Sequence, residues 1–577
     1  MMRRTGIPEN ADASTRPFAR WCSNTFEGEF VKRYLALLIG IFVFGVHAYA
    51  QHNSHSSPTS KKPIGLIESR GLVQHKVSTS NPEAQKFFDQ GLSLYYAFNE
   101  VDAARSFERA AELDPNLAIA WWGIALSKSG YGNAKSGAVV DMKAARTAFD
   151  KAMSLDSPVA ERAYIEALAK RLVADADAKA RDLYISYRDA MADVYKRFPN
   201  DPDVATLYAI SIGNTGMFWN KWTKEGKPIG NAQEMVDVLE AGLKRHPKHL
   251  GLNHMYIHAV EDSAAPERAL ASANVLRSLK LSGPELGHLV HMPSHIYLRV
   301  GDFQTAAEAN EETAAESTEG LTEQFKQWHF GHVYSFLVYS YSMQGNFAKV
   351  RDALNRGSKF SSRPPTSEQQ TFRPEDLVQQ VRFRKWDDVL KIPVTQKDSL
   401  LHWARALAFA AKKDIAAAEA ERMALSEVVD AENEKMAKQM PPEQFAAMSK
   451  MVKRLDIIFF SKVDAAIAVA KGDNETAVEL LRKAIVEEDQ IEYNEPPIVQ
   501  DPTRETLGGV LMQMGKFAEA EKVFREDLKY TRNNGRSLFG LWKALEAQKK
   551  TKEAKEVEAQ FRRAWKNADT ELRIEDL

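Results

Sequence analysis

A short pattern of small and aromatic residues recurs along this chain and constrains its fold more than any other feature. The pattern reads Ala-x3-Phe-x2-Ala from Ala103 and again from Ala145. Small residues let two helices approach closely, and the aromatic ring fills the space left between them. Related steps are centred on Ala269, Ala306, Ala477, Ala520 and Ala554. Repeated helix pairs are therefore predicted, and the fold class is all-α.

The spacing of these residues resembles that of the tetratricopeptide (TPR) repeat. Residues 84–117 supply a small residue in the first helix, the Ala-x3-Phe-x2-Ala step in the second, and Pro115 at the exit, where a helix cannot continue. Ala520 and Ala554 stand one standard TPR period apart, and Ala269 and Ala306 stand slightly further apart. We predict TPR-like helix pairs forming a right-handed superhelix, an α-solenoid.

Glycine-centred turns separate the two helices of a pair, because glycine accepts the positive φ common at helix C-termini. They are predicted at Gly301-Asp302-Phe303, Gly345-Asn346-Phe347, Gly472-Asp473-Asn474 and Gly515-Lys516-Phe517.

Breaks in the pattern divide the chain into two repeat blocks. A polar stretch with Arg363-Pro364-Pro365 predicts a linker over 356–376. It separates an N-terminal TPR-like block, 83–355, from a C-terminal one, 377–577. Residues 51–82 are rich in Ser, His, Lys and Pro, which predicts a flexible lead-in.

The first 50 residues have the layout of a secretory signal. The basic pair Lys32-Arg33 precedes an apolar stretch, Leu35 to Val46, and Ala48-Tyr49-Ala50 follows it. Cleavage is predicted between Ala50 and Gln51, which places the protein in the periplasm or outside the cell. The apolar stretch is short for a membrane span, so no stable span is expected after cleavage. Residues 1–30 fit poorly, and translation starting at Val31 or an uncleaved anchor are the alternatives.

Composition narrows the range of partners and chemistry. Without residues 1–50, the chain has 71 basic and 74 acidic residues. That balance gives no support for a nucleic-acid partner, which needs a surplus of Lys and Arg on one face. The one cysteine, Cys22, lies in the predicted signal, which excludes disulfides, thiolate metal ligands and a cysteine nucleophile from the remainder.

Histidines gather in one part of the chain and follow the repeat. Of the 13 after residue 50, nine lie between His246 and His332. His254 and His258 precede Ala269 by the same offsets at which His291 and His295 precede Ala306. Likewise, His288 stands as far before Ala306 as His332 stands before Val350. Equal register means equal facing on successive first helices, and in TPR proteins generally those slots face the concave groove.

These positions predict a ligand groove with a metal site inside it. Residues four apart share one helix face, so stripes from two adjacent helices converge. Imidazoles with a carboxylate suit zinc, copper, iron or nickel. The predicted metal ligands are His254, His258, Glu261, His291 and His295, and the groove also includes His288, His329 and His332. A hydrogen-bonded groove without metal and a purely structural role for the histidines are the alternatives.

Several longer strings resemble a specific family of exported bacterial TPR proteins, over most of residues 80–570. The most distinctive is GHLVHMPSHIYLR, Gly287 to Arg299. The others are YIHAVE from Tyr256, RFRKWDDVL from Arg382, NEPP from Asn494, RETLG from Arg504 and NGRSLFGL from Asn534. This resemblance implies the fold and export but no established reaction. The chain departs from the family at Ser335, where a second histidine is common, and at Val499, where tryptophan is usual, so a weaker or altered site is implied.

Three functions remain open from the sequence. The first is an exported binding module whose groove takes a protein, a peptide or a small ligand, with the metal inside. The second is a metal-dependent hydrolase, with Glu261 or Glu495 as the candidate base; the HExxH pattern is absent because Met255 occupies the glutamate position. The third is a metal-free assembly scaffold.

Overall fold

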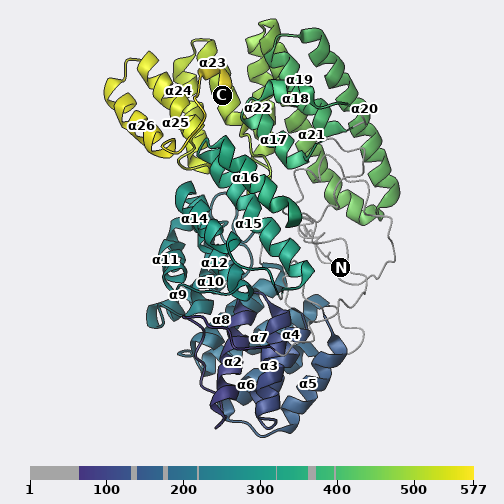
Figure 1. The fold of residues 1–577 in the computed structure, drawn as a ribbon, viewed down its shortest axis with the longest axis vertical. Coiled ribbons are helices and arrows are strands. Elements are labelled where there is room, and N and C mark those ends of the chain that lie inside the picture. The colour runs from purple at the N-terminus through teal and green to yellow at the C-terminus, as the bar shows by residue number, and fades with distance from the viewer. Residues whose placement is uncertain are drawn as a thin grey trace, which may run out of the picture.

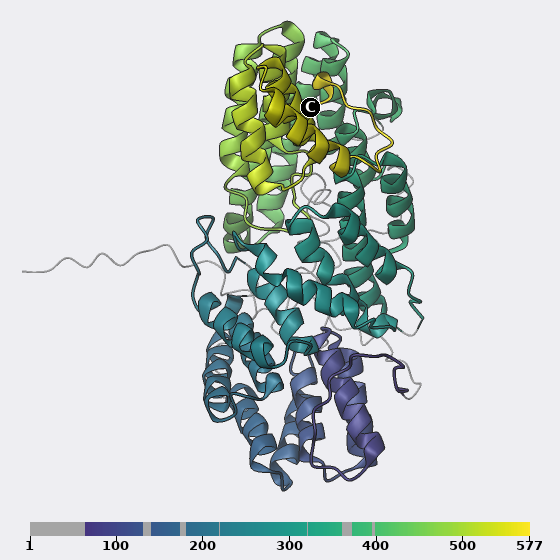
Figure 2. The same ribbon diagram turned by 90° about the vertical axis from the view of Figure 1, so that its left-hand side faces the viewer.

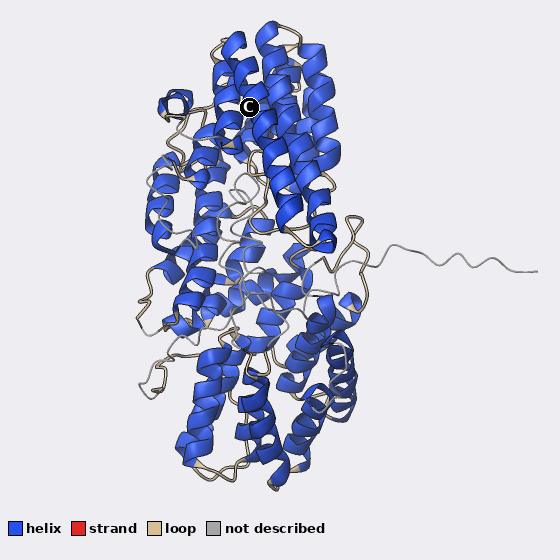
Figure 3. Ribbon diagram, turned by 90° about the vertical axis from the view of Figure 1, so that its right-hand side faces the viewer, coloured by secondary structure: helices blue, strands red, loops and turns tan. Residues whose placement is uncertain are grey.

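The computed structural model describes residues 64–130, 140–172, 180–217, 220–319, 321–360, 372–394 and 398–577. Over these ranges the chain is built from helices, and the one β-type pairing is an isolated bridge between Trp222 and Pro228 (Figure 3). No helix in these ranges is long and apolar enough to cross a membrane. The predicted signal and its cleavage site lie outside the described residues.

Helices stack along the long axis of the molecule in chain order (Figures 1 and 2). The first group, at the lower end of Figure 1, is α2 (Pro82–Tyr96), α3 (Glu100–Leu113), α4 (Ala118–Lys128), α5 (Met142–Ser154), α6 (Val159–Leu172), α7 (Ala180–Arg197), α8 (Pro202–Ile212), η5 (Gly213–Met217) and α9 (Ala232–Arg245). The middle group is α10 (Leu250–Val260), η6 (Pro266–Ala269), α11 (Leu270–Ser278), η7 (Pro284–Leu286), α12 (Gly287–His291), α13 (Pro293–Arg299), α14 (Phe303–Ala314), α15 (Glu323–Met343), α16 (Phe347–Gly357) and η8 (Ser358–Phe360).

The last group forms the upper end of the molecule in Figure 1. It comprises α17 (Pro374–Arg382), α18 (Trp386–Lys391), α19 (Ser399–Ala411), α20 (Ile415–Gln439), α21 (Pro442–Lys471), α22 (Asn474–Glu488), α23 (Thr503–Gln513), α24 (Phe517–Tyr530), α25 (Gly535–Ala547), α26 (Thr551–Ala564) and η9 (Ile574–Asp576). Neighbours in sequence pack as antiparallel pairs, for example α2 with α3, α21 with α22 and α25 with α26. The prediction of an all-α superhelix of helix pairs is confirmed.

The predicted glycine turns are present. Gly301, Gly345, Gly472 and Gly515 all adopt positive φ, between 71° and 82°. After the first three, the next residue but one begins a helix whose N-cap side chain, Asp302, Asn346 or Asp473, accepts a backbone N–H of the first turn. A turn of this kind stops one helix and starts the next with hardly any chain between them.

Close approach between helices rests on a glycine–phenylalanine–glycine step. Phe107 lies between Gly91 and Gly123, and a Cβ at either glycine would come within 2.8 Å of its ring. Phe524 lies likewise between Gly508 and Gly540. Each phenylalanine stands midway in sequence between its two glycines, and the interval is the same at both ends of the protein. One packing solution is therefore used twice.

The ordered chain begins earlier than predicted. Residues 51–82 were expected to be a flexible lead-in, but 64–81, the part within the described residues, lie extended against the first helices. Val73 and Val77 are buried, the Val73 N–H donates to Ser93 Oγ at 2.9 Å, and Ser78 Oγ donates to Glu161 at 2.8 Å. The polar composition concealed this strap because its buried apolar residues are few and widely spaced.

The two blocks touch beyond the predicted linker, most of which lies outside the described residues. Arg532, in the turn after α24, donates to Glu267 at 2.9 Å, and Asn533 Nδ2 donates to the Gly301 carbonyl at 3.3 Å. The backbone N–H of Asp569 donates to the Gly345 carbonyl at 3.2 Å. Contacts of this kind hold the end of the chain against α15 and α16.

Candidate metal centre

Helices α10, α12, α13 and α15 carry the histidines. The N-cap of α10 is His249, whose side chain accepts the Leu252 N–H. Pro293 has no N–H to donate, and it separates α12 from α13. His288 and His291 therefore sit on one short helix and His295 on the next, while His332 comes from the long α15.

The first histidine triplet consists of His254, His258 and His288. One ring nitrogen from each lies within 4.8 Å of the others. Their ring centroids are 4.8 Å apart between His254 and His258 and 5.0 Å apart between His254 and His288. A metal ion bound by three imidazoles at about 2.0–2.1 Å brings their nitrogens within this range.

The three rings of this triplet are buried, and their burial changes their hydrogen bonding and their pKa values. The three rings are at most 5% exposed. Among the described residues, His288 has no hydrogen-bond partner for either ring nitrogen, and His254 has only the backbone of Tyr96 beside it. Burial, together with the neighbouring His258, holds the pKa of His254 well below its usual value. Burial followed by His254 does the same to the pKa of His288. Both rings are therefore neutral, which is the state that binds metals.

Glu261 connects this triplet to the next helix. Its Oε1 lies 2.9 Å from His258 Nδ1 and its Oε2 lies 3.0 Å from His295 Nδ1. Burial raises the pKa of Glu261, but the charges of His258 and His295 outweigh it and the pKa falls well below the usual range. The carboxylate is thus ionised and occupied on both oxygens.

Glu495, in the segment between α22 and α23, contacts the same His295 nitrogen as Glu261. It forms a close ion pair with His295 Nδ1 and is 7% exposed. Burial raises the pKa of Glu495 to about 7. Burial lowers the pKa of His295, but Glu495 and Glu261 outweigh it and raise it to about 10.

A second triplet, His291, His295 and His332, has its donor atoms within the same 4.8 Å. His291 Nε2 and His295 Nε2 are 2.9 Å apart. The His332 ring centroid lies 4.9 Å from that of His291 and 5.6 Å from that of His295. His291 is fully buried, and His332 is half-buried.

The arrangement differs from the prediction in two respects. The predicted groove residues do not form an open surface: seven of them, all except His332, are at most 5% exposed. The four histidines among the predicted metal ligands also divide between the two triplets instead of forming one set, and Glu261 belongs to neither triplet. His329 joins neither group, although both of its ring nitrogens also lack a hydrogen-bond partner; its ring packs against Phe325 and beside Gly287.

Sequence reasoning missed Phe98 and Asn310. The Phe98 ring stacks on His258 at 5.6 Å and His288 at 5.0 Å, and lies 4.8 Å from His254. Asn310 Oδ1 is 2.6 Å from His291 Nδ1. Neither residue carries a metal-ligand signal. Phe98 stands in the turn between α2 and α3, however, where the repeat commonly places glycine.

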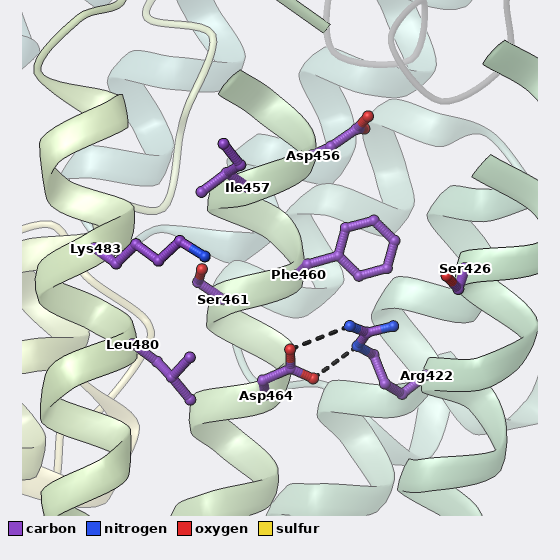
Figure 4. A pocket seen from close by; sticks show the side chains of 9 residues that line it. All are labelled: Arg422, Ser426, Asp456, Ile457, Phe460, Ser461, Asp464, Leu480 and Lys483. Carbon is purple, nitrogen blue, oxygen red and sulfur yellow. Dashed lines mark hydrogen bonds and ion pairs between the residues drawn. The ribbon is translucent and has the colours of Figure 1, made fainter. Parts of the chain in front are cut away.

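Two other features of the described chain, a polar cluster and a pocket, do not offer a comparable group of imidazole nitrogens. His75, Asp201 and Asp203 also cluster, but their polar atoms are paired: Asp203 bonds to His75 at 2.7 Å and to His249 at 3.1 Å. A pocket of about 320 Å³ lies between α20, α21 and α22 (Figure 4). The ion pair of Arg422 with Asp464 crosses it, and no histidine lines it.

Comparison with known proteins finds distant likenesses in structure. No protein-family model and no curated protein matches the chain. Among solved structures, the APC/C hetero-tetramer Cut9–Hcn1 is 12% identical, with a TM-score of 0.27 over 84% of this chain and 74% of that one. The human IFIT1 dimer with PPP-AAAA is 15% identical, with a TM-score of 0.30 over 85% and 96%. Likenesses this low carry no inference about function.

Proposed function

We propose that this protein binds a transition-metal ion inside its helical stack, at His254, His258 and His288. The observation that carries the proposal is that three buried imidazoles bring a nitrogen each to one point, where His288 has no hydrogen-bond partner and His254 none but the Tyr96 backbone. An unsatisfied buried polar group costs about 1–3 kcal/mol, and most such groups in proteins are bonded. A cation at the centre of the triplet would satisfy both rings and engage His258 with them.

The surroundings of the triplet support a bound metal. A metal-ligating histidine usually donates its other ring nitrogen to a carboxylate, which fixes the ring and raises its basicity. Glu261 holds His258 Nδ1 in this way, which directs Nε2 toward His254 and His288. The imidazole donors suit zinc, copper, iron or nickel.

The geometry supports binding better than the two alternatives. A hydrolase needs an open coordination position that substrate can reach, whereas the triplet and both candidate bases, Glu261 and Glu495, are buried. A groove ligand that contacts the histidines directly faces the same obstacle. A metal-free scaffold would give the convergence of three buried imidazoles on one point no role.

Elemental analysis tests the proposal. Protein purified without a metal-affinity tag should contain a transition metal in stoichiometric amount, and apoprotein should rebind Zn²⁺. His254→Gln with His288→Gln should abolish this binding. His402→Gln is the matched control, because His402 is also buried but is paired with Glu421 at 2.7 Å. Metal-free protein that takes up no Zn²⁺, Cu²⁺, Fe²⁺ or Ni²⁺ would sink the proposal.

We also propose export to the periplasm or beyond, supported by the basic pair, the apolar stretch and Ala48-Tyr49-Ala50. Mass spectrometry of the protein from its native cells should find an N-terminus at or near Gln51. Intact protein that begins at residue 1 and stays in the cytoplasm would contradict export.

A further inference from the structure

The two histidine triplets are built to one plan. Each combines two histidines four residues apart in one repeat with a single histidine from the first helix of the next repeat. His254 and His258 pair with His288, and His291 and His295 pair with His332. In repeat register the two pairs occupy the same two slots before their alanine steps, and the two single histidines share one slot a turn further back. The second triplet therefore uses the same three slots as the first, one repeat further along the chain.

The second triplet is held by outer contacts that leave its Nε2 edges facing one another. His291 Nδ1 is bound to Asn310 Oδ1 at 2.6 Å, and His295 Nδ1 lies 3.0 Å from Glu261 Oε2. The two Nε2 atoms that remain are 2.9 Å apart. Two nitrogens each about 2.0–2.1 Å from a shared ion would lie close to this separation. Without an ion, one proton lies between the two Nε2 atoms, and a bound ion would displace that proton and take its place.

The series stops on both sides of these two triplets. In the next repeat, which is aligned on Val350, Ser335 and Tyr339 occupy the slots of the histidine pair, and Ser335 Oγ donates to the His332 carbonyl. In the preceding repeat, Gly251 occupies the slot of the single histidine, and a Cβ there would lie 2.7 Å from Thr206. Within the described chain, the register therefore yields two triplets.

We propose that His291, His295 and His332 form a second transition-metal site, so that the protein holds two ions. This inference rests on the proposed function, since the same chemistry is applied to the second triplet. Glu261 serves both sites as an outer carboxylate, one oxygen on His258 and the other on His295. Glu495 is supplied by the C-terminal block, so the second ion links the two blocks of the molecule.

The overlapping group of Glu261, His295 and Glu495 acts as this outer support rather than as a third site. Its atoms face one another and are already paired, because His295 Nδ1 lies between the two carboxylates. The ring can bind an ion through Nε2 while Nδ1 keeps both contacts.

Counting ions in paired variants tests the inference. Apoprotein reconstituted with Zn²⁺ and freed of excess should hold two ions per chain. His291→Gln with His332→Gln should hold one, and so should His254→Gln with His288→Gln. His332→Gln alone is the gentlest change, because His332 is half-buried. His402→Gln should keep both ions, and circular dichroism should show that each variant remains helical.

Co²⁺ titration gives a second readout, because its absorption bands report imidazole coordination in each variant that remains folded. Two saturating steps are expected in the natural protein and one in each paired variant. A single ion that is lost only with His254 and His288 would overturn this inference and leave the proposed function standing. No bound ion at all would overturn both.

Discussion

At the scale of single residues, Phe98 is the most unusual position beside the histidines. Its φ of 57° lies in the left-handed region, which costs a residue with a Cβ about 1 kcal/mol or more. Its ring nevertheless stacks on His258 and His288. Arg384, Lys413 and Lys549 adopt the same conformation, φ 55–62°, in the turns of other helix pairs, so the turn itself requires it.

The backbone strain at Phe98 predicts that Gly will destabilise the protein less than Ala at this position, the reverse of the usual order in a helix. Phe98→Ala should lower the free energy of unfolding by about 3–5 kcal/mol through lost ring burial. Phe98→Gly should be milder than Phe98→Ala by about 1 kcal/mol, because glycine accepts positive φ. Phe107, in the middle of α3, is the control: there Gly should be worse than Ala by a similar amount. Urea denaturation measures all four, and a more harmful Gly at position 98 would contradict the strain.

His75 ties the N-terminal strap to α8 and makes stability depend on pH. Its Nδ1 is 2.7 Å from Asp203 Oδ2. Burial lowers the pKa of His75, but the hydrogen bond and charge of Asp203, with Asp201 and Asp89 nearby, outweigh it and raise the pKa from 6.5 to about 9. Because the folded pKa is the higher one, the protonated ring's stabilisation is fully present below pH 6.5 and is lost as pH rises through about 9.

His75→Gln should therefore destabilise the protein by about 2–3 kcal/mol at pH 6, where the natural ring is charged in both states. Near pH 9.5 the difference should shrink to that of a neutral hydrogen bond, about 1 kcal/mol. Denaturation of both proteins at the two pH values measures this. A difference that does not change with pH would show that the pKa of His75 is not raised in the folded protein.

At the scale of helices, the glycine–phenylalanine–glycine step sets how closely neighbours pack. Gly508 lies inside α23, where Ala would ordinarily stabilise the helix by about 1 kcal/mol. A Cβ there would be 2.3 Å from the Phe524 ring. Gly508→Ala should instead destabilise by about 1–3 kcal/mol through overpacking. In a Phe524→Leu background the smaller side chain makes room, so the penalty should largely disappear; thermal denaturation of the four proteins measures the coupling.

The helix repeat and the facing of the histidines could be predicted because both follow from spacing along the chain. Equal distances to Ala269 and Ala306 predicted equivalent positions for His254 and His291, and each of the two lies in one triplet. The division into two triplets could not be predicted. An imidazole reaches only the nearest turn of the neighbouring helix, and the axial shift between helices decides which turn that is. That shift brought His288 to His254 and left His291 for His332.

The burial of the histidine rings could not be predicted from the sequence either. The slots facing the concave side of a repeat line a groove only when that side stays open. Here Phe98 from the first helix pair and Glu495 from a distant segment close over the rings. Both depend on contacts between residues far apart in the chain, which neither periodicity nor composition records.

At the scale of the whole molecule, several polar contacts join the two predicted blocks, and two ion pairs are among them. Arg532 of the C-terminal block pairs with Glu267 of the N-terminal block at 2.9 Å. His295 of the first block meets Glu495 of the second. The first junction consists of permanent charges, whereas the second contains a histidine that a metal ion can also engage. Metal binding therefore bears on the stability of the assembled protein, not only on one helix pair.

Zinc should accordingly raise the stability of the whole chain. An ion that binds the folded state alone adds about 2.7 kcal/mol when its free concentration is 100 times Kd. The melting temperature of apoprotein should rise with added Zn²⁺ and fall again with a chelator, whereas Mg²⁺, which prefers oxygen ligands, should have little effect. His258→Gln with His295→Gln should abolish the zinc-dependent rise, because one ligand is lost from each triplet, while His402→Gln should preserve it. An equal rise in the double variant would place the stabilising ion outside both triplets.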